Sequence, residues 1–220
     1  MLSSAPAADK KPGMTSVDKT PSRAATALER QLAQAELPQR PTPLDAFKLA
    51  RRRFLQGERL DMSTMARELD INRVTLYRWV GSRERLLGEV MFSLWHRTFE
   101  KECERASGVG AERVAQAITG AIEGVITNPG WARQLAREGE LIMRLLTRSG
   151  AGGIQPRIIA AYRDLLAEEV ERGHLRPPTD LDELAYGLVR ISESYVYREL
   201  ITGDPPDATG AGRLLRLLLR

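Results

Sequence analysis

From Pro43 to the end of the chain, apolar residues recur at intervals of three and four positions, and this spacing restricts the folds that the chain can adopt. Such a period places apolar side chains on one face of an α-helix, whereas a half-buried strand alternates every second residue. Glycine, proline and capping residues divide the pattern into segments. We predict an all-α fold with helices, caps and stop residues included, at about 43–57, 61–70, 72–81, 82–108, 112–127, 130–138, 140–148, 156–172, 180–202 and 210–220.

The segment before Pro43 lacks this pattern. Residues 1–23 are rich in Ala, Ser, Thr, Pro and Lys, which predicts a disordered tail. Residues 24–36 have a helical composition, and the prolines in 37–43 end that segment because each removes a backbone donor. Further along the chain, a glycine-rich stretch at 149–153 predicts a flexible loop.

Positive charge is concentrated before residue 89. Residues 41–88 hold 10 Lys and Arg against 6 Asp and Glu, whereas residues 89–220 hold 17 against 19. A basic segment joined to a near-neutral body suggests a polyanion partner for one part only. Arginines that merely solvate helices would give the same excess, so charge alone does not decide.

Several classes of protein are disfavoured by composition. No apolar run reaches the roughly 18 to 20 residues of a membrane helix, so we expect a cytoplasmic protein without a membrane partner. One cysteine and two histidines are too few for an intramolecular disulfide or a clustered metal site. The sequence also has no glycine-rich phosphate-binding loop, so we expect no cofactor. Cys103 and His96 lack an orienting carboxylate and an oxyanion donor set, so we expect no enzyme activity.

The stretch "INRVTLYRWVGSRERLL", residues 71–87, has the β-branched and aromatic composition of a strand. Strand alternation would place Arg78 on the same face as Val74, Leu76 and Val80, which would bury a charge. A helix between a cap at Asn72 and a stop at residue 81 instead directs Leu76 and Val80 to one side. Its other side is then basic and aromatic, and we predict a helix.

Together with the preceding short helix and a three-residue turn, this segment forms a helix-turn-helix. In that motif the second helix enters the DNA major groove, where arginine can read guanine and methyl groups of Val and Thr can meet the thymine methyl. Hydroxyl groups and a further arginine suit phosphates. Tyr77 or Trp79 could instead close a small core. The predicted DNA-binding residues are Asn72, Arg73, Val74, Thr75, Tyr77, Arg78, Trp79 and Arg83.

The segment "DMSTMARELDINRVTLYRWVGSRERLLGEV", residues 61–90, resembles the DNA-binding segment of the TetR family of bacterial transcriptional regulators. The similarity covers roughly residues 43–95 and rests on "TLYRW" and "SRERLL" at the family's spacing. It implies that Arg73, Val74, Thr75, Tyr77 and Arg78 face DNA, with Trp79 beside the DNA backbone and Arg83 on a phosphate. Asp70 and Val74 stand where the family usually has glycine, and Trp79-Val80 where it usually has His-Phe, so the operator sequence cannot be transferred.

The resemblance implies three parts: an N-terminal extension at 1–42, a helix-turn-helix domain at 43–88, and an effector-binding and dimerisation domain at 89–220. For the homodimer we select the helices at 156–172 and 180–202, because the latter carries a seam of Leu181, Leu184, Leu188, Ile191 and Tyr195. The seam could also pack only within its own chain. Two-fold symmetry predicts a palindromic DNA operator.

Large side chains from separate helices of the third part are candidates for an effector pocket, with a few polar anchors. For each residue taken singly, simple core packing is the favoured explanation. The C-terminal half also resembles regulators of lactone-signal degradation, without a motif that can be quoted, which implies a small hydrophobic or lactone-like effector. The candidates are Trp95, Phe99, Trp131, Leu135, Ile142, Tyr162, Ile191 and Tyr195, with Arg190, Glu193 and Ser194 as anchors.

Two functions follow from these patterns. The first is a ligand-responsive, homodimeric DNA-binding transcriptional regulator, and specifically a repressor released by its effector. The alternative is an all-α small-molecule-binding or adaptor protein whose helix-turn-helix does not read DNA.

Overall fold

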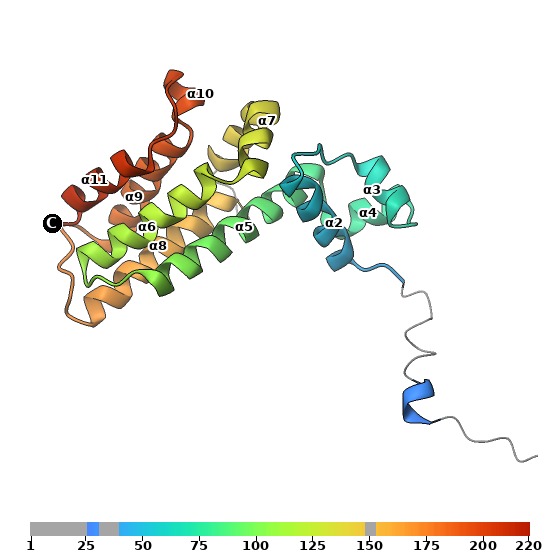
Figure 1. Cartoon of the computed structure of the whole chain (residues 1–220), viewed down its shortest axis with the longest axis horizontal. Helices are drawn as coiled ribbons and strands as arrows, with labels where there is room; N and C mark the ends of the chain where they lie inside the picture. The colour runs from blue at the N-terminus through green and yellow to red at the C-terminus, as the bar shows by residue number, and fades with distance from the viewer. Residues whose placement is uncertain (1–25, 31–39, 148–152) are drawn as a thin grey trace, which may run out of the picture. The chain divides into compact units, whose positions relative to one another are not determined.

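The computed structural model describes residues 26–30, 40–147 and 153–220, and all secondary structure in these ranges is helical (Figure 1). The all-α prediction is therefore confirmed. Residues 1–40 and 41–220 form two separate units. In the first, residues 27–30 form a helical turn in which Thr26 and Glu29 cap each other. The predicted tail at 1–23 and most of the predicted loop at 149–153 lie outside the described residues.

Three short helices and the start of a long one open the second unit. They are α2 (Pro43–Leu55), α3 (Met62–Glu68), α4 (Arg73–Val80) and α5 (Arg83–Arg105). Before each helix stands an N-cap residue whose side chain accepts a hydrogen bond from a backbone amide of the first turn. The caps of α3, α4 and α5, which are Asp61, Asn72 and Ser82, are the residues at which the sequence predicts these helices to start. One apolar core joins these helices, and it includes Phe54, Met65, Leu76 and Leu87, all nearly inaccessible to solvent.

The turn between α3 and α4 places Asp70 in the left-handed region, with a φ of 50°. The amide of Ile71 donates to the carbonyl of Ala66 and that of Asp70 to Arg67, so the turn closes α3 in the manner of a Schellman motif. Residues with a side chain rarely adopt this conformation, and glycine does so readily. The glycine that the TetR family usually has at this position therefore has a conformational reason.

The remaining helices pack around the rest of α5 (Figure 1). α5 lies along α6 and α8, α9 lies against α8 and α11, and α11 covers α6. The helix α7 contacts α2 on one side and α6 and α8 on the other. These elements are α6 (Ala111–Ile126), α7 (Pro129–Thr147), α8 (Ile154–Glu171), α9 (Leu181–Val196), α10 (Arg198–Thr202) and α11 (Ala208–Leu218).

The segments predicted at 130–138 and 140–148 are two helical stretches of α7 that meet at a kink, where Glu138 is non-helical with φ −133° and ψ 31°. The prediction of a single helix at 180–202 is wrong. The chain leaves helical geometry at Tyr197, and α10 begins at Arg198. No glycine or proline marks this break. Tyr197 is instead buried, with its ring among the core side chains.

The leucine seam predicted for a dimer is largely part of the protein's own core. Leu184 and Leu188 are buried, since α9 packs against α6, α8 and α11. Their choice as dimer contacts is wrong, and the alternative of packing within the chain describes them. The domain boundary predicted at residue 88 falls inside α5, which continues through it without interruption.

We predict that Asp70→Gly stabilises the protein by about 0.5 to 1 kcal/mol. Relief of the left-handed strain of about 1 to 2 kcal/mol exceeds the entropy that glycine loses on folding. Urea unfolding measures the difference. Asp164→Gly is the control, because Asp164 is an exposed residue inside α8 where glycine should destabilise by a similar amount. Equal destabilisation by both variants would contradict the role of the turn.

Candidate functional site

The outer face of α4 carries polar and apolar side chains that no neighbouring element covers. Val74 is 74% exposed, and Arg73 and Arg78 are exposed beside it. On the inner face Leu76 is fully buried. The side-chain oxygen of Asn72 accepts a 2.8 Å hydrogen bond from the amide of Val74, so the cap fixes the start of the helix. We call Arg73, Val74, Tyr77 and Arg78 the reading face.

Within the reading face Arg73 and Tyr77 lie one helical turn apart and touch. A guanidinium nitrogen of Arg73 donates to the Tyr77 hydroxyl at 3.4 Å, and the guanidinium carbon lies 5.4 Å from the ring centroid. This hydrogen bond raises the pKa of Arg73, with a smaller contribution from the charge of Asp61. The cation is thus held on the exposed side of α4, over a half-buried tyrosine ring.

The other predicted DNA-binding residues lie in different surroundings. Thr75 is half-buried, and Trp79 is half-buried with its ring packed against the core. Arg83 is paired inside the protein: its Nε donates to the carbonyl of Leu60 at 2.8 Å, and its Nη2 donates to the carboxylate of Glu138 at 2.5 Å. Since its guanidinium is occupied, the structure separates Arg83 from the reading face.

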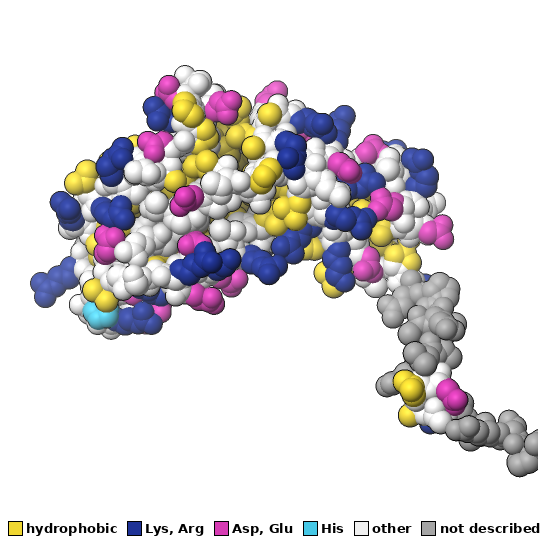
Figure 2. Space-filling view, in the orientation of Figure 1, with side chains coloured by type: hydrophobic (Ala, Val, Ile, Leu, Met, Phe, Trp, Pro, Cys, Tyr) yellow, Lys and Arg dark blue, Asp and Glu magenta, His cyan; other side chains and the backbone are white. Residues whose placement is uncertain are grey.

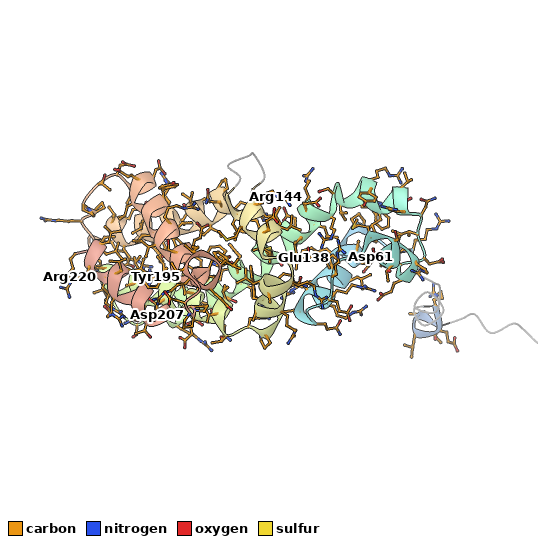
Figure 3. All side chains as sticks on the ribbon, turned by 90° about the horizontal axis from the view of Figure 1, so that it is seen from above. Asp61, Glu138, Arg144, Tyr195, Asp207 and Arg220 are labelled. Carbon is orange, nitrogen blue, oxygen red and sulfur yellow. The ribbon has the colours of Figure 1, made fainter. Side chains whose placement is uncertain are left out.

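The ion pair between Arg83 and Glu138 is mostly shielded from solvent, with side-chain exposures of 17% and 11%. It joins the first residue of α5 to the non-helical position of α7, and Arg59 lies 3.9 Å from the same carboxylate. Figure 3 shows Glu138 on the side of α7 that faces the helix-turn-helix part of the protein. No local sequence pattern links Arg83 and Glu138, because they are 55 positions apart.

Further contacts join the first half of α7 to the end of α2. Arg133 donates to the carbonyl of Leu55 at 3.0 Å, and the buried amide of Gln134 donates to the carbonyl of Glu58 at 2.7 Å. A side chain at Gly130 would lie 2.9 Å from the Leu55 Cα, so only glycine permits this approach. The rings of Phe54 and Trp131 meet edge to face at 5.3 Å. We call these contacts, with the Arg83–Glu138 pair, the α7 junction.

An internal cavity of about 40 Å³ lies between α5, α6, α7, α8 and α9. Four of the predicted ligand-binding residues line it: Trp95, Trp131, Tyr162 and the anchor Glu193. The other walls are mostly aliphatic. The remaining lining residues are Met91, Ala121, Ile122, Val125, Leu146, Ile154, Ile158, Val189, Ser192, Val196 and Tyr197.

The other predicted ligand-binding residues lie outside this cavity. Phe99 stacks on Trp95, with ring centroids 5.1 Å apart, and Leu135 lines a separate groove. Ile142 is fully buried in the core. On α9 the cavity is lined by residues 189, 192, 193 and 196, so the predicted set of Arg190, Ile191, Ser194 and Tyr195 lies off this face of the helix. Val189 and Ser192 also line the cavity, but their side chains are small and the sequence prediction did not include them.

The polar groups at the cavity are strongly affected by burial. Burial raises the pKa of Glu193 to about 7, although the charge of Arg190 beside it acts in the opposite direction. Burial also raises the pKa of Tyr162, whose hydroxyl lies 3.3 Å from that of Ser192. Both tyrosines at the cavity, Tyr162 and Tyr197, are therefore neutral phenols at physiological pH.

The cysteine considered for catalysis lies on α5 beside α8. Burial raises the pKa of the Cys103 thiol to about 11, so it is a thiol and not a thiolate at neutral pH. His96 contacts Glu100 at 3.4 Å on the same helix.

Comparisons with known proteins agree with this arrangement. Residues 109–220 match the family described as "Tetracyclin repressor-like, C-terminal domain". A comparison with the curated proteins finds no match. One similar solved structure is that of the R. erythropolis transcriptional repressor QsdR from the TetR family. It is 30% identical in sequence, has a TM-score of 0.74, and the match covers 81% of this chain and 96% of that one. A putative transcriptional regulator from Rhodococcus sp. RHA1 is 15% identical with a TM-score of 0.54, over 81% and 95%.

A capped helix-turn-helix with an exposed basic face, joined to a helical body with an internal cavity, defines the class of ligand-responsive DNA-binding regulators. Within this class, the chain belongs to the TetR family of transcriptional regulators. Across the described residues, each helix is too short or too polar to cross a bilayer.

We predict that Arg83→Met and Glu138→Gln each destabilise the protein by about 3 kcal/mol, because each leaves a shielded charge without its partner. The double variant should cost at least about 1 kcal/mol less than the two added together. Urea unfolding measures all three. The control cycle uses Arg157 and Glu89, a more exposed pair between α8 and α5, whose coupling should stay below about 1 kcal/mol. Equal coupling in both cycles would argue against the α7 junction.

Proposed function

We propose that the protein is a homodimeric, sequence-specific repressor that binds a palindromic operator and leaves it when a small molecule occupies the helical body. The observation that carries this proposal is the reading face of α4, where a 74%-exposed valine stands among exposed arginines on a helix whose other face is buried. A valine exposed to water contributes no free energy of apolar burial. In a DNA major groove the same side chain can contact thymine methyl groups.

Each residue of the reading face suits a particular contact. Arg73 and Arg78 are exposed and suit the two acceptors of guanine, while Val74 suits a thymine methyl. The hydroxyls of Thr75 and Tyr77 and the indole of Trp79 suit the phosphate backbone, and Asn72 caps the helix end that faces it. Because Arg83 is paired with Glu138, we assign it to the α7 junction in place of a phosphate.

We assign DNA reading to residues 43–88 and effector binding with dimerisation to residues 89–220. The repressor role is supported by similarity to QsdR, which is described as a transcriptional repressor. The largely apolar cavity favours a small hydrophobic effector, and a lactone-like molecule meets the same requirement. An effector shifts the protein off DNA only if it binds one arrangement of the reading heads better than the other.

For the dimer we propose the outer faces of α9 and α11. Leu214, Leu217 and Leu218 of α11 are 40%, 61% and 38% exposed and lie on one side of that helix. Tyr186 of α9 is half exposed, and a side chain added at Gly187 would meet nothing within 4 Å. An apolar row beside a small residue permits close approach of a second copy.

Binding to the DNA upstream of its own gene tests the proposed function. We expect a specific mobility shift that weakens steeply as salt rises, because arginine–phosphate contacts release counterions. Arg73→Ala should cost about 1 to 3 kcal/mol and relax the preference at one base position. Arg105→Ala, which removes an exposed arginine at the far end of α5, is the control for net charge. No specific shift at low salt would favour a binding or adaptor protein that does not read DNA.

We predict that Leu217→Glu converts the dimer to a monomer, because it places a charge in the apolar row of α11. Analytical ultracentrifugation measures the mass. Val109→Glu is the matched control, since Val109 is 64% exposed outside this face. A dimer that persists in Leu217→Glu places the interface elsewhere.

A further inference from the structure

Beside the internal cavity lies a second, larger hollow of about 440 Å³ between α6, α7 and α10. It is lined mainly by apolar residues, among them Ile126, Leu135 and Leu200. Figure 2 shows hydrophobic side chains exposed in the gap between α7 and α10. We call it the outer groove.

The outer groove and the internal cavity share a wall. Val125, Trp131, Val196 and Tyr197 line both, so these side chains form a common wall. The cavity by itself is too small for an effector, because typical ligand sites measure roughly 300 to 1,000 Å³. Rotation of the aromatic rings in the wall would join it to the groove and create a site of sufficient size.

The combined space holds one buried hydrogen-bonding group that the protein leaves unused, with a phenol near it. One carboxylate oxygen of Glu193 is buried without a hydrogen-bond partner among the described residues, while its other oxygen pairs with Arg190. Tyr197 lines the same space and is a neutral phenol. By contrast, the Tyr162 and Ser192 hydroxyls contact each other, and Ser192 donates to the carbonyl of Leu188.

Glu193 and Tyr197 are four positions apart at the end of α9, so their side chains are neighbours. One offers an acceptor and the other a phenolic donor. A carboxamide presents the complementary pair, an N–H and a carbonyl oxygen, on one carbonyl carbon. Above its pKa of about 7 Glu193 is ionised: a cation would then have to share it with Arg190, and its carboxylate would repel an anion, so a neutral head group fits best.

We propose that the cavity and the outer groove form one site for a neutral carboxamide with an apolar chain. This inference rests on the proposed function and names the chemistry of its effector. The amide N–H donates to Glu193 and the amide carbonyl accepts from Tyr197, while the chain passes between Trp131 and Tyr197 into the groove.

The path of the chain links occupancy to the reading head. Trp131 belongs to the wall that must open, and its ring packs against Phe54 of α2. The same turn of α7 holds the Leu55 carbonyl through Arg133. A chain that displaces Trp131 therefore acts on the end of α2 directly.

Isothermal titration calorimetry on the full-length protein tests the proposal with three probes: octanamide, N,N-dimethyloctanamide and octanoate. We expect octanamide to bind, the dimethyl amide to bind at least about tenfold more weakly because it has no donor for Glu193, and octanoate not to bind. Equal affinities for the two amides, tighter binding of octanoate, or no binding of octanamide would each overturn the proposal.

Variants locate the site. Glu193→Met keeps the side-chain length but removes the acceptor, so it should abolish discrimination between the two amides, whereas Glu199→Met on the groove rim should preserve it. Tyr197→Phe should weaken both amides about tenfold. Leu200→Trp, a change at a 44%-exposed position, should fill the groove and weaken octanamide at least about tenfold. Discrimination that survives Glu193→Met would refute the assigned head-group contact.

DNA binding of each sample without amide is measured in parallel. If the wild-type protein binds its operator but not octanamide, only this inference fails. If it binds no operator, the proposed function fails whatever the calorimetry gives. Operator binding by each variant also establishes that it is folded.

Discussion

The apolar face of α5 is the constraint on which the rest of the structure depends. Leu86 and Leu87 in its first turns close the core under the helix-turn-helix, and Trp95 and Phe99 further along belong to the core of the body. Because one helix supplies both cores, a tilt of α5 cannot be confined to one of them. This continuity gives a ligand in the body a mechanical route to the DNA-binding helices without any flexible linker.

The α7 junction gives this route a direction. Arg133 donates to the carbonyl of Leu55 at the end of α2, and Gln134 donates to the carbonyl of Glu58 just beyond the helix. Polar contacts of this kind depend on orientation more than apolar packing does. A small rotation of α7 therefore breaks specific bonds at α2, whereas the apolar contacts nearby tolerate it. The Arg83–Glu138 pair adds a link from the same helix to the start of α5.

The sequence predicts most helices correctly because their signals are local. Asn72 and Ser82 cap their helices through their own side chains, and the apolar spacing identifies the buried residues of α4 and α5. The break at Tyr197 has no local signal, since it depends on burial of one ring. On the cavity face of α9 the prediction included only Glu193 and missed Val189, Ser192 and Val196, because it followed the larger side chains. The Arg83–Glu138 pair depends on tertiary structure alone.

The exposed valine on α4 has a consequence for the chemistry of DNA itself. A side chain that recognises a base through the methyl group at C5 detects only that methyl group and its position in the groove. Thymine carries it, and so does 5-methylcytosine. If Val74 contacts such a position, cytosine methylation of a related site would give it part of the surface that thymine presents, and the set of sites bound in a genome would depend on its epigenetic state as well as on its sequence.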